Sequence, residues 1–237
     1  PSKAAAQLEG SKNFAKEVMH DAGVPTAKSF TVGPVQIEIE RALDTFGAPY
    51  VVKDDGLAAG KGVYISENYK EASKAVEEIF DGKFGKAENL LIEEFLNGEE
   101  MSFFIISDGQ SYKMFGTAQD HKRVSEGDVG KNTGGMGAYS PAAIVSPAIF
   151  DKVMDTVIKT TVDAMQSEGM PYTGFLYAGL MIDDKGKVKV LEYNCRFGDP
   201  ETQPIMMRLK SDLGDLCSAA IGGALNDASV EWDPRPA

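Results

Sequence analysis

Cysteine is scarce in this sequence. Among 237 residues there are only Cys195 and Cys217, too few for a disulfide framework, so we expect free thiols in a reducing compartment such as the cytoplasm. No apolar run approaches the length of a membrane span, and no signal peptide opens the chain. The first residue is Pro1 and not methionine, so we expect this sequence to be a piece of a longer polypeptide.

Positive charge is also in short supply. Lysine and arginine total 24 against 36 aspartates and glutamates, which gives a formal net charge of −12. This balance argues against a broad electrostatic grip on nucleic acid, and no membrane partner is expected. A polyanionic small molecule stays compatible with it wherever cations gather locally. The hydrophobic content of 43% and the chain length suit one large domain or two lobes.

Helix and strand patterns divide the chain into two halves. Residues 26–96 alternate as β-α-β-β-α-β, which predicts an α+β lobe with strands at 27–32, 50–53, 63–66 and 90–96. The second half predicts strands at 101–107, 111–116, 176–182 and 187–194, and helices at 147–166, 200–209 and 213–225. Residues 117–141 are polar and glycine-rich, so we expect a long loop without regular structure. The tail 227–237 is typical of a linker.

A glycine-rich loop lies between two short apolar runs of the first half. Gly56, Gly60 and Gly62 let the backbone approach a ligand and present N–H groups, and Lys53 and Lys61 add positive charge. Phosphate oxygens bind such a combination of backbone donors and cations. The spacing is neither that of a P-loop nor that of a protein-kinase glycine loop. A β-hairpin with two solvated lysines is the alternative interpretation, and these residues alone leave both open.

Glu192 and Asn194 stand two positions apart at the end of a predicted strand. Their side chains therefore point to the same face. Carboxylate and amide oxygens favour Mg²⁺ or Mn²⁺ over zinc. Arg196 follows on that face if the strand persists, where it is placed to contact metal-bridged phosphates. A polar strand edge without a metal is the alternative.

Two further segments carry candidate ligand contacts. His121, Lys122 and Arg123 are three possible cations in a row, which suit either an anion or a solvated turn. Residues 93–100 join the two halves, and a linker between lobes is a natural place for a ligand bound in a cleft. Its backbone has groups for a purine edge, and its glutamates suit ribose hydroxyls.

Several long motifs occur in an order that resembles the ATP-grasp enzymes, and among them the phosphoribosylamine–glycine ligase (glycinamide ribonucleotide synthetase) family. The resemblance covers nearly the whole chain. It is carried by residues 1–12, 55–62 (DGLAAGKG), 119–123 (QDHKR), 132–140 (NTGGMGAYS), 174–179 (GFLYAG) and 192–203 (EYNCRFGDPETQ). It implies an ATP-grasp fold of two α+β lobes with the nucleotide between them, a lid of residues 26–96, and a larger lobe of residues 1–25 and 97–226.

The resemblance also implies an activity and roles for individual residues. ATP phosphorylates glycine, and 5-phosphoribosylamine attacks the glycyl phosphate to give glycinamide ribonucleotide, ADP and phosphate. The implied nucleotide contacts are Lys12 and Lys53 on phosphates, Gly56, Gly60, Lys61 and Gly62 in a covering loop, Glu93, Glu94, Phe95 and Leu96 at adenine, and Glu99 or Glu100 at ribose. The other implied roles are metal binding by Glu192 and Asn194, catalysis by Arg196 and Lys61, and substrate binding by His121, Lys122, Arg123, Asp199 and Glu201.

Two departures from the family pattern qualify this expectation. Many ATP-grasp enzymes carry a further metal-binding carboxylate on the preceding strand, but residues 177–180 read Tyr-Ala-Gly-Leu. The domains that normally flank this region are also expected to be missing. Two alternatives therefore remain, namely another ATP-grasp carboxylate–amine ligase of purine synthesis, or a truncated nucleotide-binding module without turnover.

Overall fold

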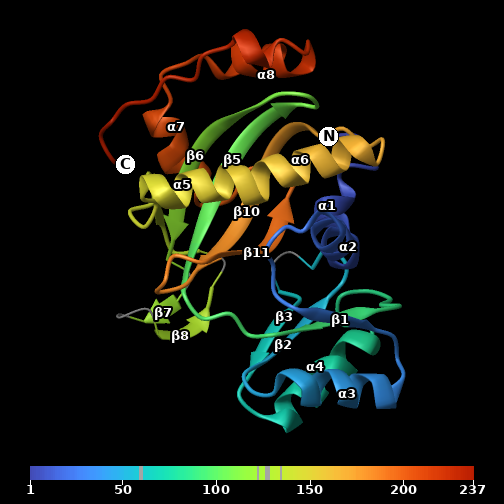
Figure 1. Ribbon diagram of the computed structural model, residues 1–237. Coiled ribbons are helices and arrows are strands. Elements are labelled where there is room, and N and C mark those ends of the chain that lie inside the picture. The colour runs from blue at the N-terminus through green and yellow to red at the C-terminus, as the bar shows by residue number, and fades with distance from the viewer. Residues whose placement is uncertain (59–60, 122, 126–128, 134) are drawn as a thin grey trace.

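The computed structural model consists of two α+β bodies, one above the other in Figure 1. It describes residues 1–58, 61–121, 123–125, 129–133 and 135–237. The smaller body contains a four-stranded sheet and the larger body a five-stranded sheet. Within these described ranges, no helix is both long and apolar enough to cross a membrane.

The smaller body is built from residues 29–93. Its antiparallel sheet has the order β1 (Ser29–Val32), β4 (Leu90–Glu93), β2 (Tyr50–Asp54) and β3 (Val63–Ser66). Helices α3 (Gln36–Phe46) and α4 (Tyr69–Phe80) cover one face, where Leu43, Val52 and Ile92 are buried together. Because strand side chains alternate between faces, Lys53 and Glu93 project from the opposite face.

One predicted strand of this body is shorter than expected. β4 ends at Glu93, and residues 94–98 form an irregular connection, in which the Glu94 N–H donates to the Lys28 carbonyl at 3.0 Å. Gly98 closes this connection with a φ of +154°, and a Cβ there would collide with the Ile182 carbonyl. The chain therefore leaves the sheet at Glu93 to reach the larger body.

The larger sheet has the order β11 (Val188–Asn194), β10 (Thr173–Ile182), β5 (Glu99–Asp108), β6 (Tyr112–Asp120) and β9 (Ala138–Tyr139). Its two faces bury separate cores, as the neighbours Phe103 and Phe104 show by packing on opposite sides. Helices α1 (Gln7–Gly10), α2 (Lys12–Ala22), α5 (Pro147–Val153) and α6 (Lys159–Ser167) pack on the first face, and α7 (Thr202–Arg208) and α8 (Leu213–Ile221) on the second. A π-helical turn, Met154–Ile158, joins α5 to α6 into the rod that crosses the sheet in Figure 1.

The expectation of a loop without regular structure at residues 117–141 is wrong. β6 runs on to Asp120, where it pairs with β9, and β7 (Arg123–Ser125) pairs with β8 (Val129–Asn132). Most residues in these pairings are polar, and the strands are short, so the sequence shows no hydrophobic alternation that would predict them.

The C-terminal tail, which the sequence suggested as a linker, lies against the larger body. Trp232 packs edge-on against Phe115 with ring centroids 5.5 Å apart. At its end, Ala237 and Ser140 exchange two backbone hydrogen bonds of 2.9 Å. The tail thereby closes over the segment that carries β9.

Candidate functional site

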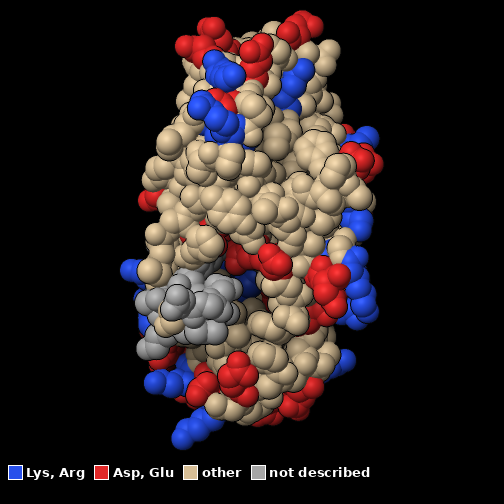
Figure 2. Space-filling view, turned by 90° about the vertical axis from the view of Figure 1, so that its left-hand side faces the viewer, with Lys and Arg blue, Asp and Glu red and all other residues tan. Residues whose placement is uncertain are grey.

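A cavity of about 400 Å³ lies between the two bodies, within the usual size range of small-molecule sites. Figure 2 shows the hollow between the bodies, with acidic and basic side chains meeting in it. Among the residues that the structure describes, four cationic side chains and three carboxylates line the cavity. Eight of the lining residues were singled out from the sequence, namely Lys12, Lys53, Gly56, Gly62, Glu93, Glu192, Asn194 and Arg196.

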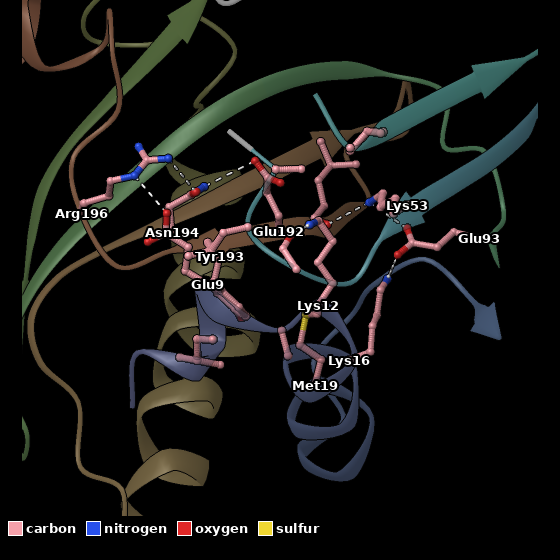
Figure 3. A pocket seen from close by; sticks show the side chains of 18 residues that line it. Glu9, Lys12, Lys16, Met19, Lys53, Glu93, Glu192, Tyr193, Asn194 and Arg196 are labelled. Atoms are coloured by element: carbon pink, nitrogen blue, oxygen red, sulfur yellow. Dashed lines mark hydrogen bonds and ion pairs between the residues drawn. The ribbon is translucent and has the colours of Figure 1, made fainter. Parts of the chain in front are cut away.

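A single buried carboxylate holds two of the cations. Glu93 Oε2 lies 2.9 Å from Lys53 Nζ, and Glu93 Oε1 lies 3.3 Å from Lys16 Nζ (Figure 3). Lys16 also donates to Thr26 Oγ1 at 2.8 Å and to the Ala27 carbonyl at 3.0 Å, and Lys53 donates to the Leu191 carbonyl at 3.3 Å. β2 and β4 present Lys53 and Glu93 on the same face, and α2 brings Lys16 to them.

Burial and charge act in opposite directions on the three lysines of the cavity. Burial lowers the pKa of Lys16 to about 8, since the attraction of Glu93 offsets it only in part. Burial also tends to lower the pKa of Lys53, but the charge and hydrogen bond of Glu93, with the charges of Glu192 and Glu100, outweigh it and the pKa is raised. Burial lowers the pKa of Lys12, against the opposing charge of Glu192. Burial therefore disfavours the charged forms of Lys12 and Lys16, and an anionic ligand in the cavity would stabilise them.

The first part of the glycine-rich loop lies against the N-terminus of α2. Lys12 Nζ donates to the Gly56 carbonyl at 2.9 Å, and the Gly56 N–H donates to Asp54 Oδ2 at 3.1 Å. At Gly62 a Cβ would come within 2.6 Å of the Ala58 Cβ, so only glycine fits there. Gly60 lies outside the described residues, and Lys61 is exposed and does not line the cavity.

The end of β11 supplies oxygen atoms. Asn194 Nδ2 lies 3.4 Å from Glu192 Oε1, and both side chains line the cavity. β11 ends at Asn194, so Arg196 does not continue the strand face as expected; it reaches Asn194 Oδ1 at 3.2 Å from the turn that follows. Glu9 fixes this turn by accepting from Arg196 Nε at 3.0 Å and from the Cys195 N–H at 2.8 Å.

Glu192 and Asn194 have the carboxylate and amide oxygens that a magnesium-type cation takes. Asn194 turns Nδ2 toward Glu192 and Oδ1 toward Arg196, so its amide would have to turn for both oxygens to meet one ion. Gly179 of β10 faces Glu192 in the sheet register, so β10 adds no side-chain ligand at that position. The described residues contain no group of three or more His, Cys, Asp or Glu arranged to hold a metal ion. Two protein oxygens are what Mg²⁺ commonly takes when phosphates and water complete its shell.

The predicted adenine and ribose residues occupy the connection between the bodies. Glu94 pairs with Lys189, Phe95 is partly exposed, and Leu96 follows it before β5 opens with Glu99 and Glu100. Glu93 alone of this group lines the cavity, and its carboxylate engages lysines.

Of the predicted substrate residues, His121, Asp199 and Glu201 are described with their side chains, and these three lie outside the cavity lining. His121 is exposed, with its ring centroid 5.8 Å from that of Tyr139, Arg123 opens β7, and Lys122 lies outside the described residues. Asp199 is exposed and accepts from Gln203 at 3.0 Å. Glu201 is buried and accepts from Ser102 Oγ at 2.9 Å and from the Tyr177 hydroxyl at 3.3 Å.

Three of the motif segments nevertheless meet at one place. A Cβ at Gly135 would lie 2.5 Å from Pro200 Cδ and 3.1 Å from Asp120 Oδ1. Residues 119–123, 132–140 and 192–203 are thus brought together through a glycine with a φ of +110°.

Sequence reasoning missed Lys16 and Glu9, which also line the cavity. Lys16 stands four residues after Lys12 on the same helix, and this spacing places both on one face. This spacing could have predicted Lys16 as a site residue. No sequence pattern could have predicted Glu9, because its partners Cys195 and Arg196 are 186 and 187 residues further along the chain.

Residues 10–202 match the sequence model of the family described as phosphoribosylglycinamide synthetase, ATP-grasp (A) domain. The phosphoribosylamine–glycine ligase of Vibrio parahaemolyticus is 55% identical over 242 residues, which cover 99% of this chain and 55% of that protein. The enzyme of the same name from Xanthomonas campestris is 54% identical over 241 residues, covering 100% and 55%. The chain therefore spans about 55% of the length of these curated relatives.

Solved structures share the fold. The crystal structure of phosphoribosylamine–glycine ligase from Thermotoga maritima superposes with a TM-score of 0.86 at 36% identity, covering 94% of this chain and 56% of that one. Carboxyaminoimidazole ribonucleotide synthase from Aspergillus clavatus, complexed with ATP, gives a TM-score of 0.75 at 19% identity, covering 100% and 57%. The second likeness concerns the fold alone. The family match itself confirms the predicted ATP-grasp fold. Since the family match extends over most of its length, the chain belongs to the phosphoribosylglycinamide synthetase ATP-grasp (A) domain family.

Proposed function

We propose that this chain is the ATP-grasp part of a cytoplasmic phosphoribosylamine–glycine ligase of purine biosynthesis. The observation that carries the proposal is the cavity in which Lys12, Lys53 and the Glu192–Asn194 pair come together beside the glycine-rich loop. The curated relatives bear that enzyme's name, and they extend beyond this chain. The division proposed is a lid of residues 26–96, a larger lobe of residues 1–25 and 97–226, and a tail of residues 227–237.

The proposed reaction has two steps, a phosphoryl transfer and an acyl transfer. A carboxylate oxygen of glycine attacks the γ-phosphorus of ATP, the bond to the β-phosphate oxygen breaks, and ADP leaves. The amine nitrogen of 5-phosphoribosylamine then attacks the carbonyl carbon of glycyl phosphate, and inorganic phosphate leaves as the amine loses a proton. Phosphate is a far better leaving group than hydroxide, so the protein has mainly to position reactants and neutralise charge.

The residues of the cavity divide this work. Lys12 and Lys53 bind phosphate oxygens, while Lys61 and the glycines at 56, 60 and 62 cover them. Arg196, held by Glu9 and Asn194, steadies the transferred phosphoryl group. Glu192 and Asn194 would hold Mg²⁺ or Mn²⁺, which neutralises phosphate charge.

The remaining contacts lie around the cavity. The backbone from Glu93 to Leu96 accepts and donates to adenine, and Glu99 or Glu100 binds ribose. We assign His121, Lys122, Arg123, Asp199 and Glu201 to glycine and 5-phosphoribosylamine. Support comes from Gly135, which lies against Pro200 and Asp120 and so joins three of the motif segments.

Calorimetric titration with ATP tests the nucleotide site. We expect saturable binding with Mg²⁺ that weakens in EDTA, in Lys53→Met and in Glu192→Gln. Glu168→Gln, an exposed carboxylate at the end of α6, is the matched control and should bind as the unsubstituted chain does. Binding that ignores EDTA and both site variants would overturn the assignment.

Turnover tests the chemistry. In a polypeptide of the relatives' full length that contains this sequence, ADP release should require glycine and 5-phosphoribosylamine. ADP release that follows formate or bicarbonate instead would assign the chain to another ligase. ATP binding with no turnover in that longer protein would make it a binding module.

A further inference from the structure

We propose that Asp55 is a positioning residue, whose carboxylate fastens the glycine-rich loop to the N-terminus of α2 and so fixes Lys12 relative to that loop. The consequence for nucleotide binding rests on the proposed function, whereas the contacts themselves do not. We refer to the contacts between residues 11–13 and residues 55–56 as the Asp55 clasp.

The clasp consists of four hydrogen bonds between segments more than 40 positions apart, one of them shared between the two carboxylate oxygens of Asp55. Asp55 Oδ1 accepts from the Asn13 N–H at 2.7 Å, and the Ser11 hydroxyl lies 3.1 and 3.2 Å from the two carboxylate oxygens. The Lys12 N–H donates to the Asp55 carbonyl at 3.1 Å, and Lys12 Nζ donates to the Gly56 carbonyl at 2.9 Å. Both the backbone and the side chain of Lys12 are therefore tied to the loop.

The local structure explains why an aspartate is needed here. The first N–H groups of a helix have no partner within the helix, and its N-terminus carries a partial positive charge. Ser11 already caps α2 by accepting from the Phe14 N–H at 3.1 Å. Asp55 adds a second acceptor from the loop, which satisfies the Asn13 N–H and places its negative charge at the favourable end of the helix.

The rest of α2 anchors the clasp to both bodies. The side chain of Asn13 accepts from Thr31 of β1, and Lys16 reaches Glu93 of β4. On its other side α2 packs in the core of the larger body, where Met19 is buried. Asp55 follows Lys53 by two residues, so the clasp keeps Lys12 of α2 and Lys53 of β2 in a fixed relation.

Two substitutions of Asp55 distinguish a positioning role from an effect of its negative charge on ATP affinity. A carboxylate beside a phosphate site repels the ligand, so its charge by itself weakens ATP binding. Asp55→Asn removes that charge but keeps an acceptor oxygen for the Asn13 N–H and the Ser11 hydroxyl. Asp55→Ala removes both. If Asp55 acts by positioning, the alanine variant loses affinity and the asparagine variant keeps it; if it acts by charge alone, both variants gain affinity.

The test measures ATP and adenosine binding to the unsubstituted chain and to Asp55→Ala, Asp55→Asn and Asp212→Ala. Asp212 caps α8 by accepting from the Asp215 N–H at 3.0 Å, far from the cavity lining, so Asp212→Ala controls for the loss of a helix cap. We expect Asp55→Ala to weaken ATP about tenfold, equivalent to ~1.4 kcal/mol, with adenosine unchanged because it lacks phosphates. Asp55→Asn should stay close to the unsubstituted chain, and Asp212→Ala should match it for both ligands.

Hydrogen exchange of the Asn13 amide, measured without ligand, tests the contact itself. It should speed up in Asp55→Ala, while the Asp215 amide stays protected. Unchanged exchange at Asn13, unchanged ATP affinity, or an equal loss for ATP and adenosine would each overturn the positioning role. If the unsubstituted chain binds no ATP, the proposed function and the positioning role both fail, and the Asn13 result still decides whether the clasp forms.

Discussion

Replacing Glu93 with glutamine is expected to be among the most damaging single changes in this chain. The Glu93 side chain is 3% exposed, and its two partners, Lys53 and Lys16, are 8% and 9% exposed. Glutamine keeps the shape but removes the only carboxylate within ion-pair distance of these two ammonium groups among the described residues. Breaking a buried ion pair on one side typically costs about 3–5 kcal/mol, against a total stability of roughly 5–15 kcal/mol for a domain.

The loss should also depend on pH with a definite sign. The pKa of Lys16 is already lowered to about 8 and falls further without Glu93, and the pKa of Lys53, which Glu93 helps to raise, falls as well. A lysine whose folded pKa is below its ordinary value destabilises the fold at low pH, and this penalty is relieved as the pH rises from the folded to the unfolded pKa. The deficit of Glu93→Gln should therefore be largest near pH 7 and shrink towards pH 10.

Urea unfolding followed by far-UV circular dichroism, at pH 7 and at pH 9.5, measures both effects. Glu94→Gln is the matched control, because Glu94 is adjacent, 26% exposed and paired with Lys189, and such a pair contributes only about 1 kcal/mol or less. The reasoning is refuted if Glu93→Gln loses no more stability than Glu94→Gln, or if its deficit grows with pH.

Three further changes have outcomes that follow from the contacts. Between pH 8 and 10.5, Lys16 is neutral in the folded protein and charged in the unfolded one, so the free energy of unfolding should rise with pH by up to about 1.4 kcal/mol per pH unit. Lys16→Met should lack this rise. Equal slopes of unfolding free energy against pH for the two proteins, measured by urea titration, would contradict this. Gly135→Ala, at φ +110° and against Pro200, should lower stability by about 1–3 kcal/mol, and by more than Gly137→Ala, whose site has open space; calorimetric melting of the two variants decides. Trp232→Ala removes the contacts with Phe115 and Arg208 and should cost roughly 2 kcal/mol, or about 4–8 °C in Tm, whereas the exposed Met207→Ala should melt as the unsubstituted chain does.

The cavity-lining residues that the sequence singled out are those related by short spacings. Lys53 and the glycines at 56 and 62 lie within ten residues of one another, and Glu192 and Asn194 share a strand face by simple alternation. The fold then brings these two groups of residues to the lining of one cavity. What they bind there stays a proposal.

The parts that were missed depend on partners distant in the sequence. Glu93 looked like the start of a connection between lobes, and nothing near it in the sequence reveals the lysine of α2, 77 positions earlier, that it engages. β9 was missed because two residues, Ala138 and Tyr139, pair with the end of β6 across a polar segment. Backbone pairing of this kind leaves no hydrophobic pattern, so only the assembled fold reveals it.

Carboxylates within the cavity explain how an acidic chain keeps cations ready for an anion. Glu93 holds Lys16 and Lys53, and Glu9 holds Arg196, so three of the four cations are already oriented by a fixed partner. Lys12 differs, because its ammonium is bonded to the neutral Gly56 carbonyl and burial lowers its pKa. A phosphate bound at Lys12 would supply an opposite charge in direct contact with this ammonium group. A site whose cations are already held in place needs little rearrangement when an anionic ligand binds. For Lys12, we attribute this positioning to the Asp55 clasp, in which one carboxylate fastens the loop to α2.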